Sequence, residues 1–112
     1  MSEPDDLLLV HTTCADAAQA RTLSEALVER RLAACASAGA PAQSTYPWNS
    51  AIEHAEEIPL TLKTTRGAFA ALESALAELH PYDVPEILAV PVVEASVAYA
   101  DWVREWVAGD QG

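Results

Sequence analysis

The stretch from His80 to Ile87, HPYDVPEI, brings together a histidine, a tyrosine, two acids and two prolines. The neutral imidazole of His80 is a ligand for copper or zinc. The alternative is structural, because a histidine in the last turn of a helix interacts favourably with the helix dipole. Pro81 disfavours further helix in any case. The stretch is therefore predicted to end a helix, and it is also a candidate wall of a metal or small-ligand cleft.

The two cysteines, Cys14 and Cys35, form no CxxC motif and no framework for disulfides. Cys14 lies where a strand gives way to a helix, a place where a thiolate is stabilised and can bind Cu(I). The alternative for Cys14 is a small buried apolar residue, and this is the reading that we favour for Cys35. Free cysteines indicate a reducing compartment.

The chain is strongly acidic, with 17 Asp plus Glu against 6 Lys plus Arg and a net charge of -11. This charge opposes binding to nucleic acid and to anionic membrane surfaces. No apolar run approaches the ~18 residues of a membrane span, and the N-terminus MSEPDD lacks the features of a signal peptide. We therefore expect a soluble, cytoplasmic protein with no nucleic-acid or membrane partner.

Hydrophobic periodicity predicts the elements that position these residues. The helix of residues 16–32 begins with the capping pattern of Asp16 and Gln19, and Thr65 can cap a second helix. Pro59 lacks the N–H of a central strand and predicts an edge strand or a bulge. In chain order the expected elements are a buried strand from residue 7, helix 16–32, a hairpin around a turn at 49–50, strand 58–63, helix 65–80, strand 87–90 and helix 96–109.

This order predicts an α+β fold, a ferredoxin-like βαββαβ sandwich with an extra C-terminal helix. Residues 7–109 form one domain, flanked by a flexible N-terminus (1–6) and a short tail (110–112). Helices cover only one face of such a sheet, so oligomerisation is expected to cover the other. Tyr46 and Trp48 on the hairpin suit an interface anchor. A role in stacking on bases is disfavoured by the charge.

Several short motifs together make the chain resemble the CutA divalent-cation tolerance family over nearly its whole length. The resemblance implies a cytoplasmic homotrimer that binds copper or other divalent cations, and it implies no known reaction. Thr12 and Leu79 replace a cysteine and a histidine that some members have, so a copper site built from those residues is incomplete here. The residues that carry the resemblance are Leu32–Cys35, Tyr46–Trp48, Ile52, Glu57, Leu62–Thr64, His80–Ile87, Pro91, Tyr99 and Trp102.

The resemblance also places Glu57, Lys63, Tyr82 and Glu86 near subunit boundaries. Lys63 is most simply one half of an interface ion pair, and a pocket for a small anion is the alternative. The departure that affects the hairpin is Ser50, which stands in place of a glycine.

Two function classes follow from these observations. The first is a trimeric protein of divalent-cation tolerance, with His80 and Cys14 as metal ligands and copper or another divalent cation bound. The alternative is a trimeric small-molecule sensor or scaffold with ligand clefts between subunits. The chain has no glycine-rich phosphate cradle and no nucleophile–base motif, so we expect neither an organic cofactor nor an enzyme.

Overall fold

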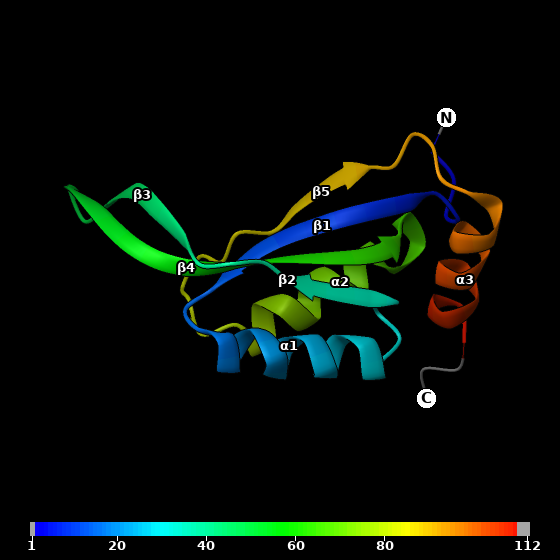
Figure 1. Ribbon diagram of the computed structural model, residues 1–112, viewed down its shortest axis with the longest axis horizontal. Helices are drawn as coiled ribbons and strands as arrows, with labels where there is room; N and C mark the ends of the chain where they lie inside the picture. The colour runs from blue at the N-terminus through cyan, green and yellow to red at the C-terminus, as the bar shows by residue number, and fades with distance from the viewer. Residues whose placement is uncertain (1, 110–112) are drawn as a thin grey trace.

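The computed structural model describes residues 2–109, and the predicted tail at 110–112 lies outside the described residues. Antiparallel strands form one sheet, in which the strand order is β2-β4-β1-β5 and β3 pairs with an extension of β4 (Figure 1). The elements are β1 (Leu7–Cys14), α1 (Ala17–Glu29), β2 (Cys35–Ala38), β3 (Ala42–Trp48), β4 (Ala51–Thr65), α2 (Arg66–Leu79), β5 (Leu88–Pro91) and α3 (Val97–Val107).

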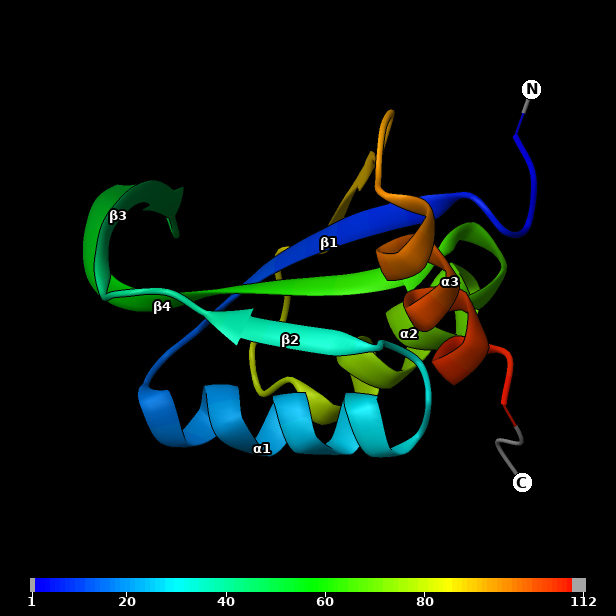
Figure 2. The same cartoon turned by 45° about the vertical axis from the view of Figure 1, so that its right-hand side comes forward.

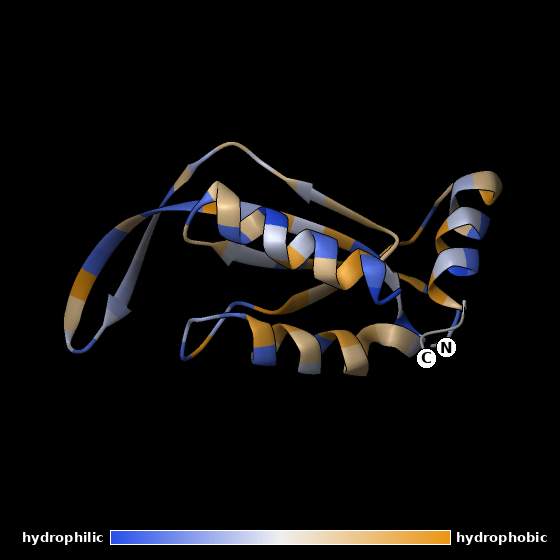
Figure 3. Ribbon diagram, turned by 90° about the horizontal axis from the view of Figure 1, so that it is seen from below, coloured by the Kyte–Doolittle hydropathy of each residue, from blue (hydrophilic) through white to orange (hydrophobic). Residues whose placement is uncertain are grey.

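Helices α1 and α2 cover one face of the sheet, and α3 stands at the end away from the β3–β4 hairpin (Figure 2). Hydrophilic and hydrophobic residues alternate along both covering helices, as expected of amphipathic helices on a core (Figure 3). The predicted α+β sandwich with an extra C-terminal helix is confirmed. No helix within residues 2–109 combines the length and the apolar character needed to cross a membrane.

The main core lies between the sheet and helices α1 and α2. Alternate residues of β1 point into it, among them Val10, Thr12 and Cys14, because side chains alternate between the faces of a strand. Leu9 and His11 point to the opposite face, as do their β5 partners Val90 and Leu88. We call this opposite side, which neither α1 nor α2 covers, the open face.

Side-chain N-caps are present on α1 and α3 but not on α2. Asp16 accepts a hydrogen bond from the backbone N–H of Gln19 at 2.8 Å, and the Gln19 side chain accepts from Ala15 N at 3.0 Å. Ser96 caps α3 through the N–H of Tyr99 at 3.3 Å. Thr65 holds the N-cap position of α2, but its side chain makes no capping hydrogen bond.

Pro59 lies in a central strand, so the predicted edge position is wrong. Its pairing partner is Thr13 on β1, and its carbonyl oxygen accepts from Gly39 N at 2.8 Å on the other side. The N–H and C=O of one strand residue point to the same side, so the missing N–H also faces Gly39. Ala38 at the end of β2 pairs with Leu60, and Ala42 at the start of β3 pairs with Glu57. Four steps along the chain from β2 to β3 therefore lie opposite three steps along β4, so this connection contains one extra residue. An extra residue in one of two paired strands is a bulge, which is the other feature that Pro59 predicted. The bulge lies on the chain opposite Pro59, between β2 and β3.

Strand β4 is a single strand of 15 residues, whereas the sequence suggested a hairpin arm followed by a separate strand. Its first half forms the predicted hairpin with β3, which extends away from the body of the molecule (Figure 1). Asn49 and Ser50 form the two-residue turn with φ of 51° and 65°. Strand β2 lies in the Ala-rich region where the sequence showed no clear period.

Candidate functional site

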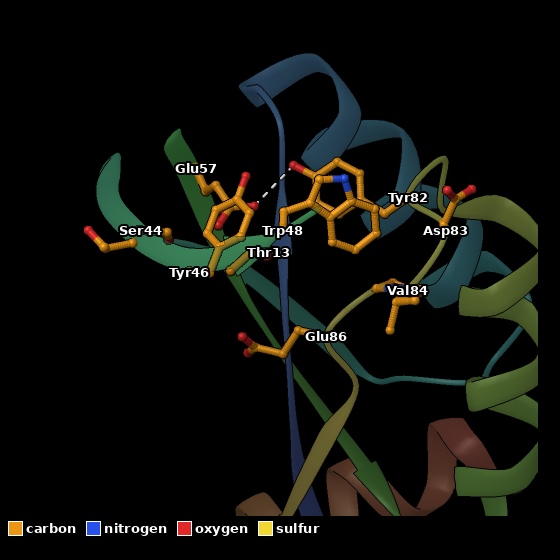
Figure 4. Close-up of a pocket in the computed structure, with 11 residues that line it drawn as sticks. Thr13, Ser44, Tyr46, Trp48, Glu57, Tyr82, Asp83, Val84 and Glu86 are labelled. Atoms are coloured by element: carbon orange, nitrogen blue, oxygen red, sulfur yellow. Dashed lines mark hydrogen bonds between the residues drawn. The ribbon is translucent and has the colours of Figure 1, made fainter. Parts of the chain in front are cut away.

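A cleft of about 650 Å³ opens where the hairpin meets the end of β1 and the loop after α2 (Figure 4). Three aromatic and three acidic side chains lie in its wall, and none of the residues between 2 and 109 that line it is Lys, Arg or His. The lining residues are Thr13, Ser44, Thr45, Tyr46, Trp48, Glu57, Tyr82, Asp83, Val84, Pro85 and Glu86.

Glu57 and Tyr82 join the two sides of this cleft. Glu57 lies on β4 and is only 8% exposed, and the Tyr82 hydroxyl donates to its Oε2 at 3.0 Å. Burial first, then the hydrogen bond and the charge of Glu57, raise the pKa of the Tyr82 phenol to about 12. Tyr82 is therefore a neutral hydrogen-bond donor at physiological pH.

His80 lies behind the cleft and is 5% exposed. Its Nε2 is 2.7 Å from the carbonyl oxygen of Thr13, and its Nδ1 lies 3.2 Å from the backbone N of Tyr82. A carbonyl oxygen only accepts and a backbone N–H only donates, so Nε2 carries the proton and Nδ1 accepts. Both ring nitrogens are thus engaged, and a metal ion could bind His80 only by displacing one of these hydrogen bonds.

His80 also follows the last residue of α2 in extended conformation, with φ of -81° and ψ of 131°. This is the backbone expected of a residue before proline. The helix-ending role predicted for HPYDVPEI is confirmed, and residues 82–86 of this stretch line the cleft.

Cys14 is the second predicted metal ligand, and it is fully buried. Burial, followed by the charges of Asp16 and Glu57, raises the pKa of its thiol to about 11. The predicted stabilisation of a thiolate by the start of α1 is therefore outweighed, because desolvation and two carboxylates favour the neutral form. Cys14 belongs to the core cluster that includes Leu27 and Leu76.

Lys63 and Cys35 lie away from the cleft, paired with each other between β4 and β2. The Lys63 ammonium is 3.8 Å from the Cys35 sulfur, which itself lies 3.7 Å from the Ser37 hydroxyl. Cys35 is half-buried, so its predicted burial is wrong, and it faces away from the helices with Lys63.

Of the six residues predicted for a cleft or interface, five line this cleft, namely Tyr46, Trp48, Glu57, Tyr82 and Glu86. Nothing in the sequence indicated that Thr13 and Ser44 line the cleft, whereas Asp83 was predicted only as part of the HPYDVPEI wall. Asp83 lies inside the HPYDVPEI block, so its neighbours were a usable signal. Thr13 on β1 and Ser44 on β3 lie at the cleft because both strands pair with β4.

No three His, Cys, Asp or Glu side chains among residues 2–109 are grouped closely enough to hold a metal ion. Glu57, Asp83 and Glu86 nevertheless give the cleft a negative lining, and no Lys, Arg or His is among the described residues that line it. Such a cleft attracts cations and repels phosphates and carboxylates, because partly desolvated walls focus the field of their charges.

The sequence of this chain is similar to those of known proteins. Residues 8–106 match the model of the CutA1 divalent ion tolerance protein family. The "Divalent-cation tolerance protein CutA" of Thermus thermophilus is 45% identical over 86 residues, which cover 77% of this chain and 84% of that protein. Human "Protein CutA" is 33% identical over 91% of this chain, which spans only 57% of the human protein.

The fold of this chain is similar to those of solved CutA structures. The crystal structure of CutA from Xylella fastidiosa superposes with a TM-score of 0.88 at 38% identity, over 91% of this chain and 98% of that one. The "Periplasmic divalent cation tolerance protein CutA" of Archaeoglobus fulgidus has a TM-score of 0.87 at 29% identity, over 90% of this chain and 98% of that one.

Proposed function

The chain belongs to the CutA1 divalent ion tolerance family, and on that premise we propose that it acts in divalent-cation tolerance as a cytoplasmic homotrimer that binds divalent cations. The observation that carries the proposal is the acidic cleft, whose wall includes Glu57, Asp83 and Glu86 and no basic side chain. A divalent cation is the simplest ion that such a wall attracts.

The chemistry of the wall bears on which cation binds. Carboxylate oxygens suit hard ions such as Mg²⁺, Ca²⁺ and Mn²⁺, whereas copper favours imidazole and thiolate ligands. The imidazole of His80 is engaged in two hydrogen bonds, and the Cys14 thiol is buried and neutral. This arrangement supports a hard divalent cation ahead of copper, although copper was an equal candidate from the sequence.

One subunit alone supplies no complete set of metal ligands within its described residues. We therefore propose that a neighbouring subunit completes the site. The homotrimer is supported by apolar side chains on the open face, where Leu88 is 59% and Val90 is 45% exposed. Exposed apolar area of this kind marks an interface.

The test is a calorimetric titration of the metal-free protein with MnCl₂ and with CuCl₂, after light scattering has established the oligomeric state. We expect a mass of three chains and saturable Mn²⁺ binding. Glu86→Gln should weaken that binding about tenfold, which is the effect of removing one charged ligand. Glu56→Gln serves as the control, because Glu56 precedes Glu57 on β4 and lies outside the cleft. Absence of Mn²⁺ and Cu²⁺ binding by the trimer contradicts the metal proposal.

We further propose that the protein is not an enzyme and resides in the cytoplasm. Tyr82 is held neutral, and the cleft wall contains no histidine that could act as a base for Thr13 or Ser44. Both cysteines are free thiols, which suits a reducing compartment. Detection of the protein in a periplasmic fraction, the location named for the Archaeoglobus relative, contradicts the cytoplasmic part.

A second candidate function has its own support. The cleft volume of about 650 Å³ is far larger than a single ion requires and lies in the range of about 300–1,000 Å³ for small-molecule sites. This favours the alternative of a trimeric sensor or scaffold that holds a small ligand. Thermal stabilisation of the metal-free trimer by a small molecule distinguishes this function from metal binding alone.

A further inference from the structure

We propose that the cleft binds an organic ammonium cation, such as a quaternary or protonated amine, between its aromatic and acidic side chains. The inference rests on the second candidate function and names its ligand class. Three aromatic rings, those of Tyr46, Trp48 and Tyr82, line the same cleft as three carboxylates (Figure 4). Aromatic faces with nearby negative charge are the chemistry by which proteins recognise ammonium groups.

The aromatic side chains are available to a ligand. Trp48 is 45% and Tyr46 is 38% exposed, although both line the concave cleft. Both come from β3, while Tyr82 comes from the loop on the other side, so the rings reach the cleft from two different segments. A cation held within about 6 Å of a ring centroid is attracted by the electron-rich face of the ring.

Glu57 supplies the buried charge. Glu57 is 8% exposed, and its Oε2 accepts a hydrogen bond from the Tyr82 hydroxyl at 3.0 Å. A carboxylate with so little exposure is stabilised by a second partner, either a cation or a hydrogen-bond donor. Because Glu57 lines the cleft, a ligand in the cleft can supply that partner.

The same features argue against other ligand classes. Nucleotides and other phosphate esters are repelled, because three carboxylates and no basic side chain line the cleft. A bare metal ion uses the carboxylates of the cleft but gains little from its aromatic rings. An organic cation uses the volume, the rings and the charges together.

The experiment compares choline with its uncharged isostere, 3,3-dimethylbutan-1-ol, by calorimetry on the full chain in the presence of a chelator. We expect saturable choline binding with a Kd below 1 mM and at least tenfold weaker binding of the alcohol. Trp48→Ala and Glu57→Gln should each weaken choline binding at least tenfold. Glu56→Gln, which makes the same charge change outside the cleft, should leave it within twofold.

If Glu57→Gln or Trp48→Ala changes the trimer or its melting temperature, Glu86→Gln replaces it, because Glu86 is exposed and lines the cleft. A severalfold loss of choline affinity in Glu86→Gln then supports the inference. No binding of choline at 10 mM, equal binding of the alcohol, or affinities unchanged in these variants overturns it. Choline is not a chelating ligand, so its result is independent of the Mn²⁺ titration, and either proposal can fail while the other stands.

Discussion

Thr12 and Thr64 lie on the neighbouring strands β1 and β4, and both are almost completely buried, with exposures of 1% and 0%. The Thr64 hydroxyl donates to the carbonyl oxygen of Leu32 at 2.7 Å. The Thr12 hydroxyl has no hydrogen-bond partner among the described residues. One core therefore contains a satisfied and an unsatisfied threonine, and the difference is open to measurement.

We expect Thr12→Val to raise the free energy of unfolding by about 1 kcal/mol, because it removes an unsatisfied buried hydroxyl at nearly constant volume. Thr64→Val should lower it by about 1–2 kcal/mol, because a buried carbonyl loses its donor. Urea denaturation at one fixed trimer concentration checks both. Equal effects of the two substitutions would contradict the assignment of hydrogen bonds.

His80 provides a second prediction at the residue scale. His80→Ala should destabilise the fold by about 2–3 kcal/mol, since it removes two buried hydrogen bonds, while leaving Mn²⁺ affinity within twofold. His54→Ala is the control, because His54 is exposed on the hairpin and bonds only the Thr45 hydroxyl, at 3.0 Å. Loss of Mn²⁺ binding in a folded His80→Ala variant would show that His80 is a metal ligand.

The raised pKa values of Cys14 and Tyr82 predict how stability depends on pH. Folding raises the pKa of Cys14 from 9.0 to about 11 and that of Tyr82 from 10.0 to about 12. The native state thus holds protons that the unfolded state releases, so the stability that these two groups contribute is fully present below pH 9 and is lost between pH 9 and about 12. Double substitution with Cys14→Ala and Tyr82→Phe should flatten this fall in urea melts, and Tyr99→Phe on α3 should not.

Among the elements, the β3–β4 hairpin carries local strain at its turn. Asn49 and Ser50 both have positive φ, the conformation of a type I′ turn, in which the second residue is most often glycine. Serine in the left-handed region costs about 1 kcal/mol relative to glycine.

We expect Ser50→Gly to stabilise the protein by about 0.5–1 kcal/mol and to raise its melting temperature. Ser37→Gly on β2 is the matched control and should destabilise, because glycine inside a strand loses entropy without relieving a positive φ. Differential scanning calorimetry measures both, and a stabilising Ser37→Gly would show that turn strain is not the cause.

The end of α1 shows how one element fixes another. Arg31 has a φ of 59° and follows the helix in a Schellman arrangement, with Arg31 N bonding Val28 O and Leu32 N bonding Leu27 O, both at 3.0 Å. Glycine is usual there, but the Arg31 guanidinium lies 3.7 Å above the Trp106 ring and donates to Trp106 O at 3.0 Å. The strained backbone of Arg31 is thus coupled to the docking of α3.

At the scale of the whole molecule, the proposed trimer depends on the open face. Val90 is 45% exposed, and β5, on which it lies, forms an outer strand of the sheet. We expect Val90→Asp to dissociate the proposed trimer, because burying a charge at an apolar interface is costly. Ala77→Asp on the exposed side of α2 is the control and should leave it intact. Light scattering at micromolar concentration measures the mass of both variants. If the Val90→Asp variant is still a trimer, the open face does not form the subunit interface.

The sequence by itself determined those helices and strands whose apolar residues recur at a regular spacing. Apolar spacing placed α1, α2, α3, β1 and β5, and the proline after His80 placed the end of α2, because these signals depend on residues a few positions apart. The order of elements then allowed one main topology, and the motif spacing identified the family. Five of the six residues predicted for a cleft or interface line the cleft, because they belong to those motifs.

Only the tertiary structure decided the chemistry. The hydrogen bonds of His80 to Thr13 and of Glu57 to Tyr82 join residues 67 and 25 positions apart, which no local pattern specifies. The same holds for Pro59, whose missing N–H is harmless because it meets the bulge between β2 and β3. Local residue types determine what a side chain can do. Strand pairing and burial determine whether its nitrogen, thiol or carboxylate is free to do it.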